Sequence, residues 1–225
     1  MRFAVLTKLP AETVPEADQC LLKQIPRLGA SKEKLAAFEL TQKTMLAGRF
    51  ATKAIYQPML AIYKQDGSKW VEDARGAMLA YLARYDEKGG LELLKQGIKL
   101  GDGQSSNAVT SLCDTFYSPT VNRFLEEELQ REDDPTVVAE AANVLSVSGP
   151  AEDQAVIRAR LDRWTKEWAA QEKQSDPKQA RLQAELILTV ISGKNCQMDE
   201  TEANRLKESC VSDDCRDNIR RLDHP

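Results

Sequence analysis

The chain has 225 residues, of which 42% are hydrophobic, 29% charged and only 6% aromatic. This composition suits a buried core of closely packed helices better than a β-sandwich. The net charge of −4 argues against a nucleic-acid-binding protein, which normally carries a basic face. No apolar run approaches the roughly 20 residues that cross a bilayer, so we expect no membrane span.

The first residues lack the apolar core and the cleavage site of a signal peptide. We therefore expect a cytoplasmic protein. The alternative is an exported, periplasmic protein from which a targeting segment has been removed.

Residues 1–68 are expected to form an N-terminal arm and a helical cap. Alternating apolar residues predict an extended arm over residues 3–9. A first helix is expected from about Pro15 to Ile25. Pro26 would end it, because proline removes a backbone donor and clashes with the preceding turn.

Two more helices are expected in this cap. Ser31 is a candidate cap for a helix that ends near Gly48. That helix carries four residues at helical spacing, namely Leu35, Phe38, Gln42 and Met45. A third helix is expected from about residue 55 to 66, and Pro58 inside it predicts a kink or a break.

The clearest helical periodicity begins at Trp70. Its apolar residues recur every three or four positions, as on one wide helical face. They are Trp70, Ala74, Ala77, Met78, Tyr81 and Leu82. Glycines within residues 89–90 and 101–103 are expected to turn the chain, and the next stripe covers residues 108–117.

Three later helices are expected to begin with the same signal. It is a capping side chain followed by proline, as in Ser118-Pro119, Asp134-Pro135 and Asp176-Pro177. Proline at the first helical position gives up only a donor that has no partner there. Residues 182–191 are apolar nearly all round, so their helix is expected to be the most buried.

Residues 194–225 are expected to form C-terminal capping helices. Asp199 and Glu202 have the spacing of a capping box. A last short helix is expected at about residues 213–222. In total the sequence predicts about 11–12 helices and an all-α fold. The expected architecture is an α-solenoid, in which antiparallel helix pairs stack into a right-handed superhelix.

A weak internal repeat supports this architecture. Residues 74–79, 108–113 and 139–144 carry small residues at their first and fourth places and an apolar residue at the sixth. The offsets between these segments are 34 and 31 residues. A period of this length is typical of helical repeats.

These features resemble the HEAT-like helical repeat family, in its short bacterial form. Residues 134–145 look most like the first helix of that family, and residues 176–191 look similar. The resemblance covers about residues 69–193 and departs from the pattern at 104–133, where no aspartate heads the helix. The signature positions of the rival TPR family are not found. The resemblance implies one continuous domain, with the repeats between the N-terminal cap and the C-terminal capping helices.

No catalytic motif is present in the sequence. The chain lacks a phosphate-binding P-loop, a G-x-S-x-G nucleophile turn and an H-E-x-x-H zinc motif. Its only histidine is His224, so a Ser-His-Asp or Cys-His site would depend on a terminal residue. We expect a protein that is not an enzyme and that uses no cofactor, metal or small-molecule substrate.

Two groups of residues are candidates for binding a partner protein. Glu126, Glu127 and Glu128 belong to an acidic run, interpreted as a solvated helix face or as a docking surface for a basic partner. Trp164 and Trp168 lie one helical turn apart. They are expected to pack in the core, or to form a binding hot spot if they protrude.

The five cysteines leave several states open. Cys20 and Cys113 fall on apolar helical faces and are expected to be small core residues. Cys196, Cys210 and Cys215 lie near the C-terminus. They would be free thiols, or would form one disulfide with one thiol left over. A metal site is disfavoured, because no C-x-x-C pair exists.

The leading hypothesis is a scaffold that binds another protein along one face of the helical stack. Solenoids expose a long and rigid concave surface that suits this role. One alternative is an exported helical module pinned by a disulfide. Another is a helical-repeat enzyme or a nucleic-acid repair module, which would need a basic groove.

Overall fold

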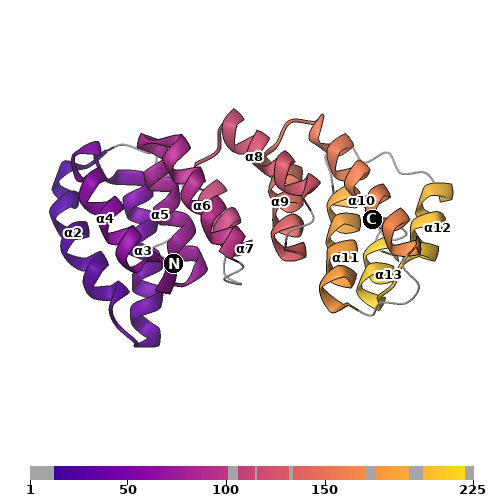
Figure 1. The fold of residues 1–225 in the computed structure, drawn as a ribbon, viewed down its shortest axis with the longest axis horizontal. Helices are drawn as coiled ribbons and strands as arrows, with labels where there is room; N and C mark the ends of the chain where they lie inside the picture. The colour runs from indigo at the N-terminus through magenta and orange to yellow at the C-terminus, as the bar shows by residue number, and fades with distance from the viewer. Residues whose placement is uncertain are drawn as a thin grey trace. The chain divides into compact units, whose positions relative to one another are not determined.

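A computed structural model describes residues 13–100, 106–114, 116–131, 134–170, 176–192 and 200–220. These residues contain twelve α-helices and two short 3-10 helices, and no β-strand occurs among them (Figure 1). Successive helices pack against one another in pairs. The predicted all-α fold class is confirmed, and the pairing is compatible with a helical-repeat fold. No helix in the described ranges combines the length and the apolar character that a bilayer crossing requires.

The helices gather into two compact units, one ending at Phe116 and the other beginning at Tyr117. This division falls inside the predicted repeat region of residues 69–193. Within unit 1 the helices are α2 (Pro15–Gly29), α3 (Lys34–Phe50), η1 (Lys53–Ile55), α4 (Tyr56–Asp66), η2 (Gly67–Lys69), α5 (Glu72–Tyr85), α6 (Glu87–Leu100) and α7 (Ser106–Cys113).

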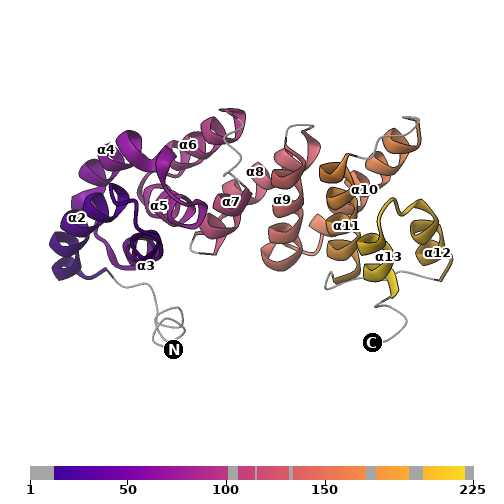
Figure 2. The same ribbon diagram turned by 90° about the horizontal axis from the view of Figure 1, so that it is seen from below.

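Helix α5 is the centre of unit 1. All ten of its residues from Ala74 to Ala83 are buried, and α3 and α7 pack against it (Figure 2). Small residues allow this close approach. A Cβ added at Gly76 would lie 2.5 Å from the carbonyl oxygen of Ala108 and 2.6 Å from the Cβ of Ser111. The segments 74–79 and 108–113, which the sequence suggests are repeats, therefore lie on two helices in direct contact.

Helix α2 does not end at Pro26, as the sequence suggested, but continues to Gly29. Proline costs the helix one backbone hydrogen bond. Burial of the neighbouring side chains outweighs that cost, since Ile25 and Leu28 are only 0% and 4% exposed. The arm predicted at residues 3–9 lies outside the described residues.

Helix α3 buries a different face from the one that carries its largest apolar residues. Its buried residues are Ala36, Leu40, Thr44, Ala47 and Gly48. Leu35 and Phe38 are 66% and 61% exposed. Ser31 does not cap the helix, which begins at Lys34 after Glu33 without a side-chain cap.

The break expected at Pro58 occurs earlier in the chain. The 3-10 turn η1 ends at Ile55, and α4 then runs unbroken through Pro58. Pro58 stands in the first turn of α4, where backbone N–H groups have no intrahelical acceptor. A proline there removes no helical hydrogen bond.

Unit 2 contains α8 (Pro119–Gln130), α9 (Pro135–Ser148), α10 (Asp153–Ala170), α11 (Pro177–Ser192), α12 (Glu200–Ser209) and α13 (Asp213–Arg220). The three predicted proline starts are confirmed. The Ser118 hydroxyl accepts from the N–H of Val121 at 3.1 Å. The carboxylates of Asp134 and Asp176 each accept from the N–H two residues on, at 2.9 Å.

Helix α11 is the centre of unit 2 and packs against α9, α10 and α13. Its buried apolar residues include Leu182, Leu186, Ile187 and Val190. It was expected to be the most buried helix of the chain. Among the described residues α5 has the longer buried run, because Gly and Ala side chains let neighbours close on it from several sides.

Candidate functional site

The three glutamates of α8 point in different directions and do not form one exposed acidic patch. Glu127 is exposed. Glu126 is half-buried and accepts a hydrogen bond from the Asn122 amide at 3.2 Å. The Glu128 side chain is 1% exposed and forms a 2.7 Å ion pair with Arg131. Glu126 and Glu128 are therefore engaged inside unit 2, and Glu127 is the one of the three with an exposed side chain.

Trp164 is a core residue, not an exposed hot spot. It is 3% exposed, and its indole N–H donates to the Gln179 side-chain oxygen at 3.0 Å. Trp168 belongs to α10, but its side chain lies outside what the structure describes. Trp164 therefore stabilises the packing of α10 against α11 and offers no surface to a partner.

A polar cluster joins α8 to the start of α10. Asp153 is 2% exposed, and burial together with the nearby Glu126 raises its pKa, although a hydrogen bond from Asn122 acts in the opposite direction. The Tyr117 hydroxyl donates to the Asn122 side-chain oxygen. The raised pKa means that the folded state favours the protonated form of the Asp153 carboxyl. The cluster is surrounded by packed helices, and we interpret it as a structural feature of unit 2.

In the described part of the chain no three potential metal ligands from His, Cys, Asp or Glu come together. The buried thiol of Cys113 is a poor nucleophile, because burial and the nearby Asp114 raise its pKa to about 12. Cys20, which was expected in the core, is exposed. It stands beside Leu21 on the outer side of α2, whose buried stripe consists of Asp18, Leu21, Ile25 and Leu28.

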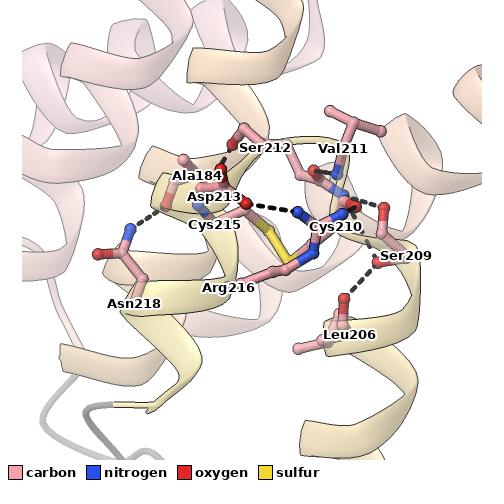
Figure 3. The surroundings of a disulfide bond; sticks show 11 residues. Ala184, Leu206, Ser209, Cys210, Val211, Ser212, Asp213, Cys215, Arg216 and Asn218 are labelled. Atoms are coloured by element: carbon pink, nitrogen blue, oxygen red, sulfur yellow. Dashed lines mark hydrogen bonds and ion pairs between the residues drawn. A yellow bond between two sulfur atoms is a disulfide. The ribbon is translucent and has the colours of Figure 1, made fainter.

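Cys210 and Cys215 are joined by a disulfide at the corner between α12 and α13 (Figure 3). Their Cα atoms are 5.6 Å apart. The two residues are 6% and 0% exposed, so the bond is enclosed by packed side chains. Cys196, the third candidate, lies outside the described residues.

The disulfide corner is also held by hydrogen bonds to α11. The buried Gln183 amide donates to the Ser209 carbonyl at 2.8 Å and accepts from the Val211 N–H at 3.0 Å. The Asn218 amide donates to the Ala184 carbonyl at 3.0 Å. Sequence reasoning missed Gln183, although a single amide inside the apolar run 182–191 is a usable signal for a buried polar clamp.

The most prominent exposed apolar feature lies on α3. We call Leu35, Phe38, Gln42 and Met45 the α3 stripe. Leu35 and Phe38 are exposed, and the other two are half-buried. A cleft of about 270 Å³ borders the stripe, between the end of α2 and the start of α3. Its lining includes the apolar residues Leu28 and Ala36 and the acidic residues Glu33 and Glu39. The other large apolar residues that are exposed in the described ranges are single valines. Single exposed apolar residues are ordinary.

No protein-family model, curated protein or solved structure matches this chain. The class of protein is therefore defined by the fold alone, as an all-α protein of paired helices. Its two distinguishing local features are the exposed α3 stripe in unit 1 and the disulfide corner in unit 2.

Proposed function

We propose that this protein is a non-enzymatic, HEAT-like helical module that binds another protein through the α3 stripe. The observation that carries the proposal is the exposure of Leu35 and Phe38, three residues apart on one helix. Residues at this spacing are neighbours on a helical surface, so a partner could cover both at once. Fully burying an apolar side chain of this size contributes about 1.5–3 kcal/mol.

The cleft beside the stripe adds polar groups to this surface. Interfaces with an apolar centre and a polar rim are the usual arrangement in protein complexes. Here the apolar centre would be Leu35 and Phe38, and the rim would include Arg27, Glu33 and Glu39. The earlier candidates Glu128 and Trp164 are buried in unit 2 and do not enter the proposal.

The test is affinity capture from the native cell with matched surface variants. Leu35→Glu and Phe38→Glu place a charge in the stripe, whereas Val147→Glu places one at an isolated exposed valine, 64% exposed, on α9. We expect a protein captured by the wild-type chain and by Val147→Glu to be lost with both stripe variants. Circular dichroism checks that all three variants fold. Equal capture by folded stripe variants would contradict the proposal.

A second candidate is an exported helical module whose C-terminal helices are pinned by a disulfide. The enclosed Cys210–Cys215 bond favours it, because structural disulfides persist mainly in oxidising compartments. Cells are quenched with acid, and the denatured protein is alkylated before and after reduction. We expect Cys210 and Cys215 to react only after reduction, and the exposed Cys20 to react at once. Immediate alkylation of all three would remove this candidate.

A further inference from the structure

We propose that the protein bound at the α3 stripe is a second copy of this chain, with the two α3 helices side by side and parallel. This inference rests on the proposed function, because it names the partner of the same surface. Leu35 and Phe38 would face the same two residues of the second copy. Lys34 of each copy would pair with Glu39 of the other.

The stripe lies on the side of α3 that faces away from the core of unit 1. Each residue turns an α-helix by about 100°. On this basis the stripe is centred roughly opposite the buried residues Ala36, Leu40, Thr44 and Ala47. A helix can therefore approach Leu35 and Phe38, the exposed part of the stripe, from the side of α3 that is away from the core.

The spacing of the stripe is that of a coiled-coil seam. Its four residues are separated by three, four and three positions, which is how the two seam positions of a heptad alternate. Leu35 and Phe38 would form the apolar layers at the exposed end. Gln42 would meet its equivalent in the second copy, and a polar residue at such a position favours one register.

The flanking charges favour the parallel arrangement. Lys34 immediately precedes Leu35, and Glu39 immediately follows Phe38. In a parallel pair the residue before the first seam position faces the residue five positions later in the partner helix, which brings Lys34 to Glu39 on both sides of the seam. In an antiparallel pair each of these two positions would face the same position of the partner helix. Lysine would then oppose lysine and glutamate would oppose glutamate.

The available area predicts a weak and reversible dimer. Two partly exposed side chains of this size offer on the order of 250 Å² per copy, below the roughly 800 Å² of a stable interface. The dimer should therefore form in a concentration-dependent way. It should also weaken as salt is added, because exposed ion pairs are screened.

The experiment is sedimentation equilibrium of the full chain at low salt, from about 10 μM to about 1 mM, a range chosen for weak association. We expect the average mass of the wild type to rise toward that of a dimer, and Phe38→Glu to keep the chain monomeric. Lys34→Glu and Glu39→Lys should each raise the dissociation constant at least about fivefold, because each creates two repulsive pairs. The double variant Lys34→Glu/Glu39→Lys should restore association, and Val147→Glu should leave it unchanged.

Each departure from this pattern overturns the inference. A wild-type chain that stays monomeric throughout removes the second copy as the partner. A dimer that survives Phe38→Glu uses another surface, and a double variant as weak as the single variants excludes the parallel pairing. A monomeric chain that still captures a different protein through Leu35 and Phe38 would refute this inference while leaving the proposed function intact.

Discussion

The two units are stabilised in different ways. In unit 1 the central helix α5 buries ten consecutive residues, and α3 and α7 close on it through small side chains. The C-terminal end of unit 2 has far less to bury. Leu206 is the only buried residue of α12, and Cys215 and Ile219 are those of α13. Short polar helices gain little from apolar burial, so they need specific links to stay in place.

Those links in unit 2 are polar and covalent. Two ion pairs join α10 to α12. Arg158 of α10 lies 2.5 Å from Glu202 of α12, and Arg205 of α12 lies 3.5 Å from Asp162 of α10. Gln183 and the disulfide then fix the corner between α12 and α13. One chain thus combines a helix stabilised by apolar burial with helices stabilised by a few ion pairs, hydrogen bonds and a disulfide. The two regions should therefore respond to different substitutions.

Unit 1 also uses polar links, but at a corner next to its core. The Tyr81 and Tyr85 hydroxyls donate to the carbonyls of Thr52 and Ala51 at 2.7 and 2.8 Å. Asp18 accepts from both the N–H and the hydroxyl of Thr52. These bonds satisfy backbone groups in the non-helical connection between α3 and η1. They supplement a packed core instead of replacing one.

The largest expected effect on stability comes from replacing a buried leucine by alanine, and the same substitution in each unit should have a different result. Leu82→Ala in α5 removes a side chain that is 0% exposed and should lower the free energy of unfolding by about 3 kcal/mol. Leu206→Ala in α12 should mainly loosen that helix. Urea denaturation measures the first effect, and amide hydrogen exchange measures the loss of protection in α12. Equal global destabilisation by both variants would contradict the comparison.

The next effect tests the covalent link. Replacing Cys210 and Cys215 together by serine should cost unit 2 about 2 kcal/mol, because an open chain has more conformational entropy when unfolded. The matched control is Cys20→Ser, at an exposed free thiol. Thermal unfolding with and without reductant provides the measurement. Reductant should lower the melting temperature of the wild type but not that of the double variant.

A smaller effect is expected at the tyrosine corner of unit 1. Tyr81→Phe leaves the Thr52 carbonyl without its phenol donor and should cost about 1 kcal/mol. Burial raises the pKa of Tyr81, so the phenol keeps its proton at neutral pH. Tyr56→Phe is the control, because the Tyr56 hydroxyl makes an exposed bond to Asp86 at 3.2 Å. Urea denaturation should show little change for that variant, and a larger cost for it than for Tyr81→Phe would contradict the assignment.

The smallest effect concerns pH and unit 2. The folded state raises the pKa of Asp153, so it favours the protonated carboxyl. The resulting stabilisation is complete below the unfolded pKa of about 3.9 and is lost as pH rises through the higher folded value. Asp153→Asn carries no charge at any pH. It should therefore gain stability relative to the wild type as pH rises from about 4 to about 8.

Urea denaturation across that pH range measures the difference between the two proteins. Asp217→Asn, at an exposed ion pair with Arg220, is the control for the loss of a surface carboxylate. Glu126 and Glu152, whose charges help to raise the pKa of Asp153, are unchanged in both variants. A stability difference that does not vary with pH would show that folding leaves the pKa of Asp153 unchanged, which would contradict the raised pKa.

Local signals in the sequence predicted the helices well. The starts at Ser118, Asp134 and Asp176 depend on a capping oxygen and a proline, which act within a few residues. The apolar residues that recur every three or four positions from Trp70 onward likewise identify α5, because this spacing by itself indicates a buried helical face. The all-α class follows from such local features.

The choice of buried face was predicted less well, because it depends on neighbours far away in the chain. On α3 the core-facing residues are mostly small and Leu35 and Phe38 face outward, since small side chains let α3 pack closely against α5. Glu128 was expected on a solvated or partner-binding face and is buried by tertiary packing, whereas Trp164 packs in the core, the first of the two expectations for it. Helix α2 likewise continues past Pro26, because the neighbouring side chains are buried.

The contact between Gly76 and Ala108 limits how far this sequence can diverge. Hydrogen is the one side chain that fits at position 76, because any Cβ would meet a backbone carbonyl that cannot swing aside. In a library of all single substitutions selected for folded protein, position 76 should tolerate almost nothing. The outward positions of α3 should accept many residues in the same selection. Tolerance to mutation would thus map the helix interface of unit 1 independently of any function.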